Sequence, residues 1–154
     1  MTAMTSAGTT LAISAGNPAT FDEAGFDALT FTTIGEITSL DGDIGRVYNL
    51  VTHNPLATRA TVKKKGSYNS GSITIPLAID RDDAGQTLAL AARDSDNNYS
   101  FKLVMQDGTE LFFQGIVMSF PVNFGGVDAI TSGTITVEIT ADDNGNDFVE
   151  VAAA

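Results

Sequence analysis

Strict alternation of apolar and other side chains is the feature of this chain that most restricts its fold. Residues Ile73–Ile79 carry Ile or Leu at every second position, and Thr134–Thr140 carry Ile or Val in the same way. Successive side chains of a β-strand point to opposite faces, so a period of two indicates strands with one buried face. Further strands are predicted at Thr9–Ser14, Leu29–Leu40 with an irregularity at Gly35, Phe101–Met105 and Glu110–Phe124. The chain is therefore predicted to be mainly β, an antiparallel sandwich or barrel.

One α-helix is predicted, at Asp82–Arg93. Asp83 is placed as its N-cap, with Gln86 three residues later as the capping-box partner. Arg93 falls in the last turn, where a cation suits the helix dipole. The segment Arg46–Ser70 has poor periodicity and is predicted to be a long loop, which in a small domain is usually functional or disordered. Strand structure in part of it, around Ala60–Lys65, is left open because of the Thr–Val pair there.

The length of 154 residues suits a single domain. Residues 1–8 are polar and aperiodic and are predicted to form a flexible N-terminal arm. Residues 141–154 are acidic and Ala-rich and are predicted to form a C-terminal tail. The sequence lacks a signal peptide and an apolar run of membrane-spanning length. No membrane contact is therefore expected, and cytosolic synthesis is the simpler interpretation.

Charge is distributed unevenly along the chain. Arg46–Ser70 holds five basic residues and no acidic one, a charge of +5, whereas the remainder holds three basic and nineteen acidic residues, a charge of −16. Together they give the net charge of −11. An acidic surface repels duplex DNA, so it does not suit a protein that holds nucleic acid but suits one that lets it pass. A basic segment on an acidic body favours docking on an acidic partner, and the nearest one in a homo-oligomer is another copy.

No constellation of residues indicates catalysis or a metal site. The chain has no cysteine, and His53 is its only histidine, to which we assign a structural role. Counted from Asp142, the acidic run Asp142–Asp147 has Asp147 and Ala153 at the sixth and twelfth positions, where a calcium loop requires glycine and glutamate, so it is interpreted as a solvated turn. Acidic residues at Asp80–Asp83 and Asp41–Asp43 are interpreted as helix-start and turn residues. We therefore expect neither an enzyme nor a bound cofactor.

Two longer runs of sequence carry a resemblance to a known family. Tyr48–Leu56 and Thr61–Asn69 resemble the major tail tube proteins of long, non-contractile-tailed bacteriophages of the lambda-like group. Shorter segments are similar in order and spacing: Gly8–Leu11, Leu29–Glu36, Tyr99–Lys102 and Gln106–Thr109. Because each motif is short, the resemblance depends on their collinear order across most of Gly8–Thr140.

The resemblance implies a structural virion protein with a β-sandwich and one flanking helix. Six subunits close into a ring whose inner strands form one barrel around a lumen, and rings stack into the tail tube of a siphophage. A long loop and the termini grip neighbouring rings. The tube surrounds a tape-measure protein, meets tail terminator and baseplate or tail-tip proteins, and passes double-stranded DNA during ejection. Because the sequence ends in an acidic tail, we do not expect the additional immunoglobulin-like domain that some relatives carry.

Two sets of residues are candidates for this assembly. The basic segment is the candidate inter-ring contact, with Lys63–Lys65 interpreted as a docking face in preference to a solvated run or a nucleic-acid patch, since aromatics are not interleaved. Its residues are Arg46, Arg59, Lys63, Lys64, Lys65 and Tyr68. Small polar and acidic side chains that would not trap phosphate are the candidates for the lumen, namely Ser72, Thr74, Thr134, Thr136, Glu138 and Thr140. The alternative is a monomeric β-sandwich that serves as a binding or decoration module on a virion or cell surface.

Overall fold

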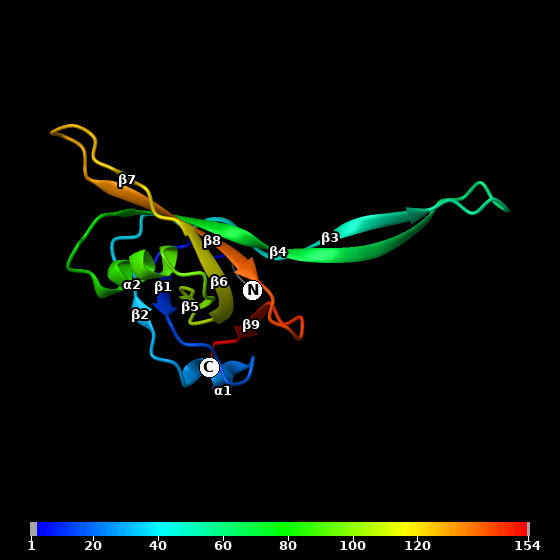
Figure 1. Ribbon diagram of the computed structural model, residues 1–154, viewed down its shortest axis with the longest axis horizontal. Coiled ribbons are helices and arrows are strands. Elements are labelled where there is room, and N and C mark those ends of the chain that lie inside the picture. The colour runs from blue at the N-terminus through cyan, green and yellow to red at the C-terminus, as the bar shows by residue number, and fades with distance from the viewer. Residues whose placement is uncertain (1–2, 154) are drawn as a thin grey trace.

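Strands dominate the computed structural model, which describes residues 3–153 (Figure 1). In chain order the elements are β1 (Thr10–Ser14), α1 (Glu23–Asp27), β2 (Thr32–Thr33), β3 (Asp41–His53), β4 (Val62–Ala78), α2 (Ala84–Arg93), β5 (Tyr99–Val104), β6 (Glu110–Ser119), β7 (Val122–Asn123), β8 (Ser132–Thr140) and β9 (Phe148–Val151). The predicted N-terminal arm lies partly outside the described residues, and its described part, residues 3–8, is exposed.

All strands join one antiparallel sheet in the order β2-β1-β5-β6-β8-β4-β3, with β7 paired to β8 and β9 paired to β6. The two segments with strict alternation lie side by side in the sheet, where β4 pairs with β8 over seven residues. Their Ile, Leu and Val side chains face one side and are buried, while the residues between them face the other side. The predicted antiparallel β fold is confirmed.

One segment, residues 32–38, bridges two edges of the sheet. At its start β2 pairs with β1, and the Ile34 amide donates to the Leu11 carbonyl oxygen at 2.9 Å. At its end the Glu36 carbonyl oxygen accepts from the Ala78 amide, also at 2.9 Å. The sheet therefore curls around its apolar face. The strand predicted at Leu29–Leu40 is wrong in extent, because only Thr32–Thr33 form a strand, with an isolated bridge from Ile37 to Leu77. The predicted irregularity at Gly35 is confirmed, because the chain crosses between edges there and Glu36 has a φ of 63°.

The hydrophobic core lies inside this curled sheet. Its aromatic centre is a stacked pair, Phe101 and Phe113, whose ring centroids lie 5.3 Å apart. Within residues 3–153 every buried side-chain nitrogen or oxygen has a hydrogen-bond partner. The core therefore combines dense apolar packing with satisfied polar groups. Its fully buried aliphatic side chains include Leu11, Ile13, Ile75, Leu77, Ile135 and Val137.

Helix α2 covers part of the core and begins close to the predicted position. The Asp83 carboxylate accepts a hydrogen bond of 2.9 Å from the backbone amide of Gln86, which confirms Asp83 as the N-cap. The Gln86 side chain differs from the predicted capping box. It is buried, and it donates to the carbonyl oxygens of Gly35 and Ala78. Gln86 thus fastens the helix to the bridging segment and to the end of β4.

Helix α1 was not predicted from the sequence. It is only five residues long, too short for a helical period to show, and the Asp22 carboxylate caps it by accepting from the Gly25 amide. Its Phe26 ring stacks on Phe112 of β6 with centroids 5.2 Å apart. Because its neighbour Phe113 faces the core, Phe112 faces the opposite side of the sheet. A second aromatic cluster therefore covers the outer side of β6 at this point.

The predicted long loop Arg46–Ser70 is a β-hairpin instead. Strands β3 and β4 stay paired as far as His53 and Val62, and only residues 54–61 connect them. In Figure 1 this hairpin, hereafter the arm (residues 46–70), projects far from the body at the right. Most side chains on both of its faces are exposed, so neither face needs to be apolar and no alternation marks the strands.

The C-terminal residues also contain structure that the sequence analysis did not assign. After β8 the chain leaves the sheet at residues 141–147 and returns as β9, which pairs with β6 from Phe113–Phe148 to Glu110–Val151. The signal for this strand is the short apolar group Phe148, Val149 and Val151, which follows an acidic run and precedes alanines. The predicted tail is therefore a turn followed by a paired strand.

Candidate assembly surfaces

A polar face covers the central strands on the side away from the core. It contains all six residues proposed for the lumen, because the cross-strand pairs Ser72–Glu138, Thr74–Thr136 and Pro76–Thr134 place them side by side. Thr140 follows on the same side of β8, opposite Gln114 of β6. The six residues proposed from the sequence therefore lie on one surface of the sheet. We call this surface the polar face.

Two more carboxylates extend the polar face onto β3. Asp41 pairs with Thr74 and Asp43 with Ser72, so both share the side of the sheet on which Glu138 lies. The turn predicted at Asp41–Asp43 is wrong, because these residues begin β3. Asp41 and Asp43 are two residues apart, and this spacing is the sequence signal for two side chains on the same face of a strand. The face combines small polar side chains with three carboxylates.

The strands that carry the polar face end in two unpaired edges. β3 is the last strand of the sheet, so within the described part of the chain no strand pairs with its outer edge. On the other side, β5 pairs with β6 only as far as Gly115, and among residues 3–153 no strand pairs with the outer edge of residues 116–119 or of β7. Asp41, Thr74, Thr136 and Ser119 form one row across the four strands. The two open edges therefore lie at the same level of the sheet.

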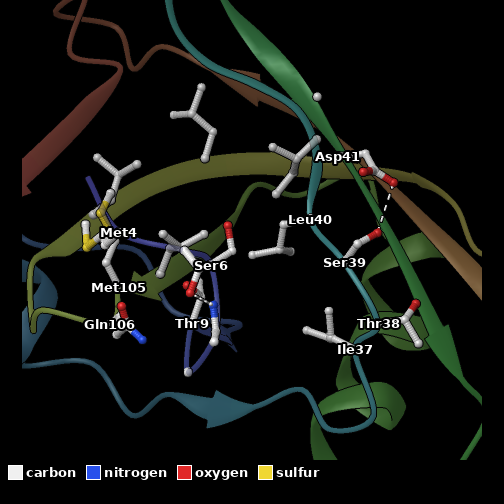
Figure 2. A pocket seen from close by; sticks show the side chains of 18 residues that line it. Met4, Ser6, Thr9, Ile37, Thr38, Ser39, Leu40, Asp41, Met105 and Gln106 are labelled. Carbon is white, nitrogen blue, oxygen red and sulfur yellow. Dashed lines mark hydrogen bonds between the residues drawn. The ribbon is translucent and has the colours of Figure 1, made fainter. Parts of the chain in front are cut away.

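A groove lined by both polar and apolar side chains lies next to the start of β3, with a volume of about 880 Å³. Residues 4–9 form one wall and residues 37–44 the other, and Figure 2 shows Met4 and Met105 on the side opposite Leu40 and Ile37. Next to it, the Ser39 hydroxyl donates to the Asp41 carboxylate at 3.1 Å.

The outer part of the arm carries exposed cations. Arg59, Lys63, Lys64 and Lys65 are all exposed, and among residues 3–153 none of the four has a carboxylate within salt-bridge distance. The lysines stand opposite Thr52, Val51 and Leu50 of β3. Large apolar side chains are exposed along the arm as well, namely Val47, Leu50, Val51, Leu56 and Val62. A solvated structural hairpin does not need such a surface.

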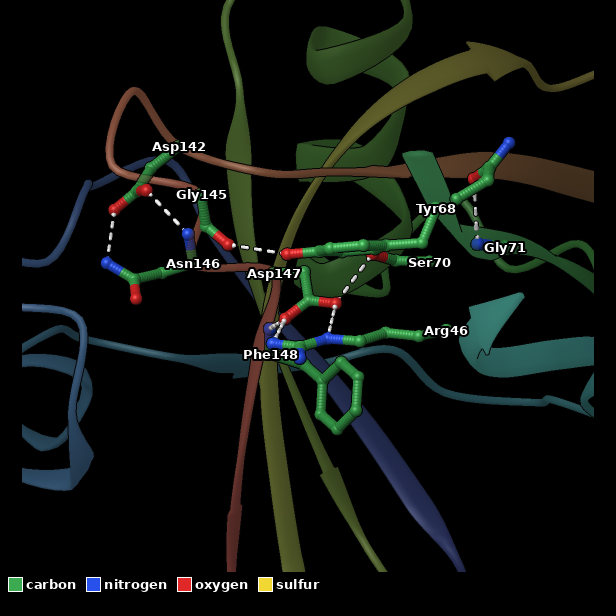
Figure 3. A network of polar contacts seen from close by, with 10 residues as sticks. Arg46, Tyr68, Ser70, Gly71, Asp142, Gly145, Asn146, Asp147 and Phe148 are labelled. Atoms are coloured by element: carbon green, nitrogen blue, oxygen red, sulfur yellow. Dashed lines mark hydrogen bonds and ion pairs between the residues drawn. The ribbon is translucent and has the colours of Figure 1, made fainter. Parts of the chain in front are cut away.

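At its base the arm is fixed to its own subunit (Figure 3). Arg46 donates two hydrogen bonds of 2.9 Å to the carboxylate of Asp147, which is 1% exposed. The Ser70 hydroxyl donates to the same carboxylate at 2.8 Å, and the Tyr68 hydroxyl donates to the Gly145 carbonyl oxygen at 3.1 Å. The structure therefore separates Arg46 and Tyr68 from the four outer cations with which the sequence analysis grouped them.

Asp147 is charged although it is buried. Burial raises the pKa of its carboxyl, but the hydrogen bonds from Arg46 and Ser70 outweigh this effect and hold the pKa below its usual value. The hydrogen bond to Asp147 in turn raises the pKa of Arg46. The interpretation of Asp142–Asp147 as a solvated turn is thus wrong for Asp147. The two partners are 101 residues apart, so no local pattern could have revealed the pair.

The carboxylate of Asp142 organises the turn that carries Asp147. It accepts from the amides of Asn144 and Asn146 and from the Asn146 side chain, at 2.8–3.0 Å. Within residues 3–153 no group of three His, Cys, Asp or Glu side chains is arranged to hold a metal ion.

His53 lies exposed near the tip of the arm, opposite Val62. The described helices are all too short or too polar to cross a bilayer.

Solved structures with the same arrangement of strands come from phage tails and related particles. The SPP1 tail tube matches with a TM-score of 0.60 and 15% identity, over 84% of this chain and 72% of that chain. The chain has the tail-tube fold. A sheath/tube terminator of an extracellular contractile injection system matches with a TM-score of 0.64 and 10% identity, over 99% of both chains. The tail of an empty gene transfer agent particle, solved with C6 symmetry, matches with a TM-score of 0.57 and 13% identity, over 85% and 92%. No family model and no curated protein sequence matches the chain.

Proposed function

We propose that this chain is the structural subunit of a tail tube, which it builds by forming rings that stack. The observation that carries the proposal is the pair of open sheet edges on either side of one polar face. Unpaired edges are a hazard that monomeric proteins normally cover, twist or charge. Here they lie at one level of the sheet, where a second copy can pair with each. The tail-tube fold supports this use of the edges.

The ring closes when the β3 edge of one subunit pairs with the β6–β7 edge of the next. Each neighbouring pair among β3, β4, β8 and β6 is antiparallel, so β3 and β6 run in opposite directions. Contact between the two edges therefore continues the antiparallel sheet from subunit to subunit. We propose six subunits, in keeping with the C6 symmetry of the gene transfer agent tail. Closure removes every edge of this kind.

The polar face lines the lumen of this ring. It carries Asp41, Asp43 and Glu138 among small polar side chains, and no Lys or Arg takes part in its central cross-strand pairs. Phosphate groups of passing DNA then meet carboxylates and hydroxyl groups instead of cations, so they do not bind tightly. The lumen thus serves as a conduit during DNA ejection and surrounds a tape-measure protein before it.

Rings stack through the arm. Its outer cations and exposed apolar side chains reach a neighbouring ring, while Arg46 and Tyr68 hold its base. A tail terminator at one end and baseplate or tail-tip proteins at the other complete a virion tail, which is assembled from subunits made in the host cytoplasm. The role is structural and involves no catalysis.

Size-exclusion chromatography and electron microscopy of the purified chain test the proposal. Rings or tubes are expected at high concentration. The variant Lys63→Glu, Lys64→Glu, Lys65→Glu keeps the fold of the subunit but loses tubes, because it reverses the arm's charge. Monodisperse single subunits of the unmodified chain at every concentration would instead favour the monomeric binding module, and tubes of normal length from the variant would refute the role of the arm.

A further inference from the structure

The loop between β7 and β8 exposes three large apolar side chains at one end of the molecule. Phe124 is 68% exposed, Val127 103% and Ile130 78%. They occupy residues 124–131, a short loop that projects beyond the body at the upper left of Figure 1. Clustered apolar side chains on a projecting loop mark a surface that contacts another protein.

Exposed acidic residues lie beside this loop. The Ile79 amide donates to the Thr131 carbonyl oxygen at 2.9 Å, which joins the loop to the start of the connection between β4 and α2. Asp80 and Asp82 follow in that connection with the exposed Arg81 between them, and Asp128 lies within the loop itself, so the three carboxylates outnumber the one cation. All three acidic side chains are exposed. We call residues 124–131 together with Asp80 and Asp82 the acceptor end.

The acceptor end and the tip of the arm lie at opposite ends of the longest axis of the molecule (Figure 1). Their chemistry is complementary. The tip carries Leu56, 105% exposed, with exposed cations, whereas the acceptor end carries exposed apolar side chains with exposed acids. A copy displaced along the axis brings the tip of one subunit to the acceptor end of the next. Such a head-to-tail contact does not close on itself and repeats without limit.

We propose that the acceptor end binds the arm tip of a second copy of this chain in the adjacent ring. The exposed cations of the outer arm, Arg59 and Lys63–Lys65, bring positive charge to the three acceptor carboxylates, and Leu56 packs on the apolar loop. The inference rests on the proposed function, because it names the surface that receives the arm. The apolar contact supplies affinity, and the opposite charges set which ends meet.

Charge exchange between two variants tests this pairing. The arm variant is Lys63→Glu, Lys64→Glu, Lys65→Glu, and the acceptor variant is Asp80→Lys, Asp82→Lys, Asp128→Lys. Each alone places like charges at the contact and raises the concentration needed for tubes by more than about tenfold. An equimolar mixture again pairs opposite charges, and tubes return near the concentration of the unmodified chain. The matched control is Asp96→Lys, Asp143→Lys, Glu150→Lys, which changes the net charge equally at exposed sites elsewhere and leaves assembly intact.

The outcomes separate the inference from the function on which it rests. Circular dichroism first establishes that each variant is folded. Tubes from the unmodified chain with none from the mixture would refute binding of the arm tip to the acceptor end but would not refute the tube function. Equal loss from the control would overturn it too, because net charge alone would then explain the effect. Absence of tubes from the unmodified chain would overturn both.

Discussion

The body and the arm of this molecule share the long strands β3 and β4 but differ in how far their side chains are buried. In the body, β4 buries Ile73, Ile75 and Leu77 and exposes the residues between them in part. In the arm, the same strand exposes Val62 to Lys65 without interruption, and β3 exposes Val47, Leu50 and Val51 opposite them. The body therefore obtains its stability from its own core. The arm has no core, and its apolar and basic surface is suited to a partner.

The largest effect on subunit stability is expected from the body. Phe113→Ala removes a fully buried ring from the stacked pair with Phe101, which costs about 3–5 kcal/mol of the free energy of unfolding. Urea unfolding followed by circular dichroism measures it. An exposed residue of the arm provides the control, since Leu50→Ser changes the unfolding midpoint little. Equal losses at the two positions would contradict the distinction between body and arm.

A smaller effect is expected where the two regions meet. Asp147→Ala leaves the Ser70 hydroxyl and the guanidinium of Arg46 without their shared acceptor, at a cost of about 1–3 kcal/mol. Thermal and urea unfolding measure this loss, and Asp143→Ala on the same turn, where the side chain is exposed, is the control. If the Asp147 variant were as stable as the control, the ion pair would not fix the arm.

The same residue gives the subunit a dependence on pH. The pKa of Asp147 is lower in the fold than in the unfolded chain, so the unfolded chain takes up the proton first as the pH falls. The stability from this group is complete above about pH 4, the ordinary value for Asp, and is lost as the pH falls through the folded pKa. Unfolding in urea between pH 2 and about pH 5 should show a shallower decline for Asp147→Asn than for the unmodified chain. Identical slopes for the two chains would contradict a pKa of Asp147 below its usual value.

The smallest effect on stability is expected from removing the outer arm. Replacing residues 50–65 by an Asn-Gly turn removes exposed strand only, so the free energy of unfolding changes by at most about 1 kcal/mol. Assembly is lost because the arm no longer reaches its neighbour. Sedimentation velocity of the shortened chain measures both the folded subunit and the absence of tubes. A shortened chain that still formed tubes would show that the arm is dispensable.

The sequence revealed the regions in which one face of a strand is buried. The pattern of Ile73–Ile79 and Thr134–Thr140 predicted the central strands, and with them the six residues that share the polar face. The arm was predicted to be a loop because its exposed strands have no apolar period. The crossing at Gly35, the five-residue helix α1 and strand β9 depend on contacts between distant segments. The pair of Arg46 and Asp147 depends on such contacts too, so local pattern could not disclose it.

A helical reconstruction of the assembled tube by electron cryomicroscopy tests the central claim most directly. If the open edges and the polar face build the conduit, Thr74, Thr136 and Glu138 face the lumen, β3 of one subunit pairs with β6 of the next, and the arm crosses to the adjacent ring. A map that places Glu138 on the outer wall, or the arm free in solvent, would contradict the account.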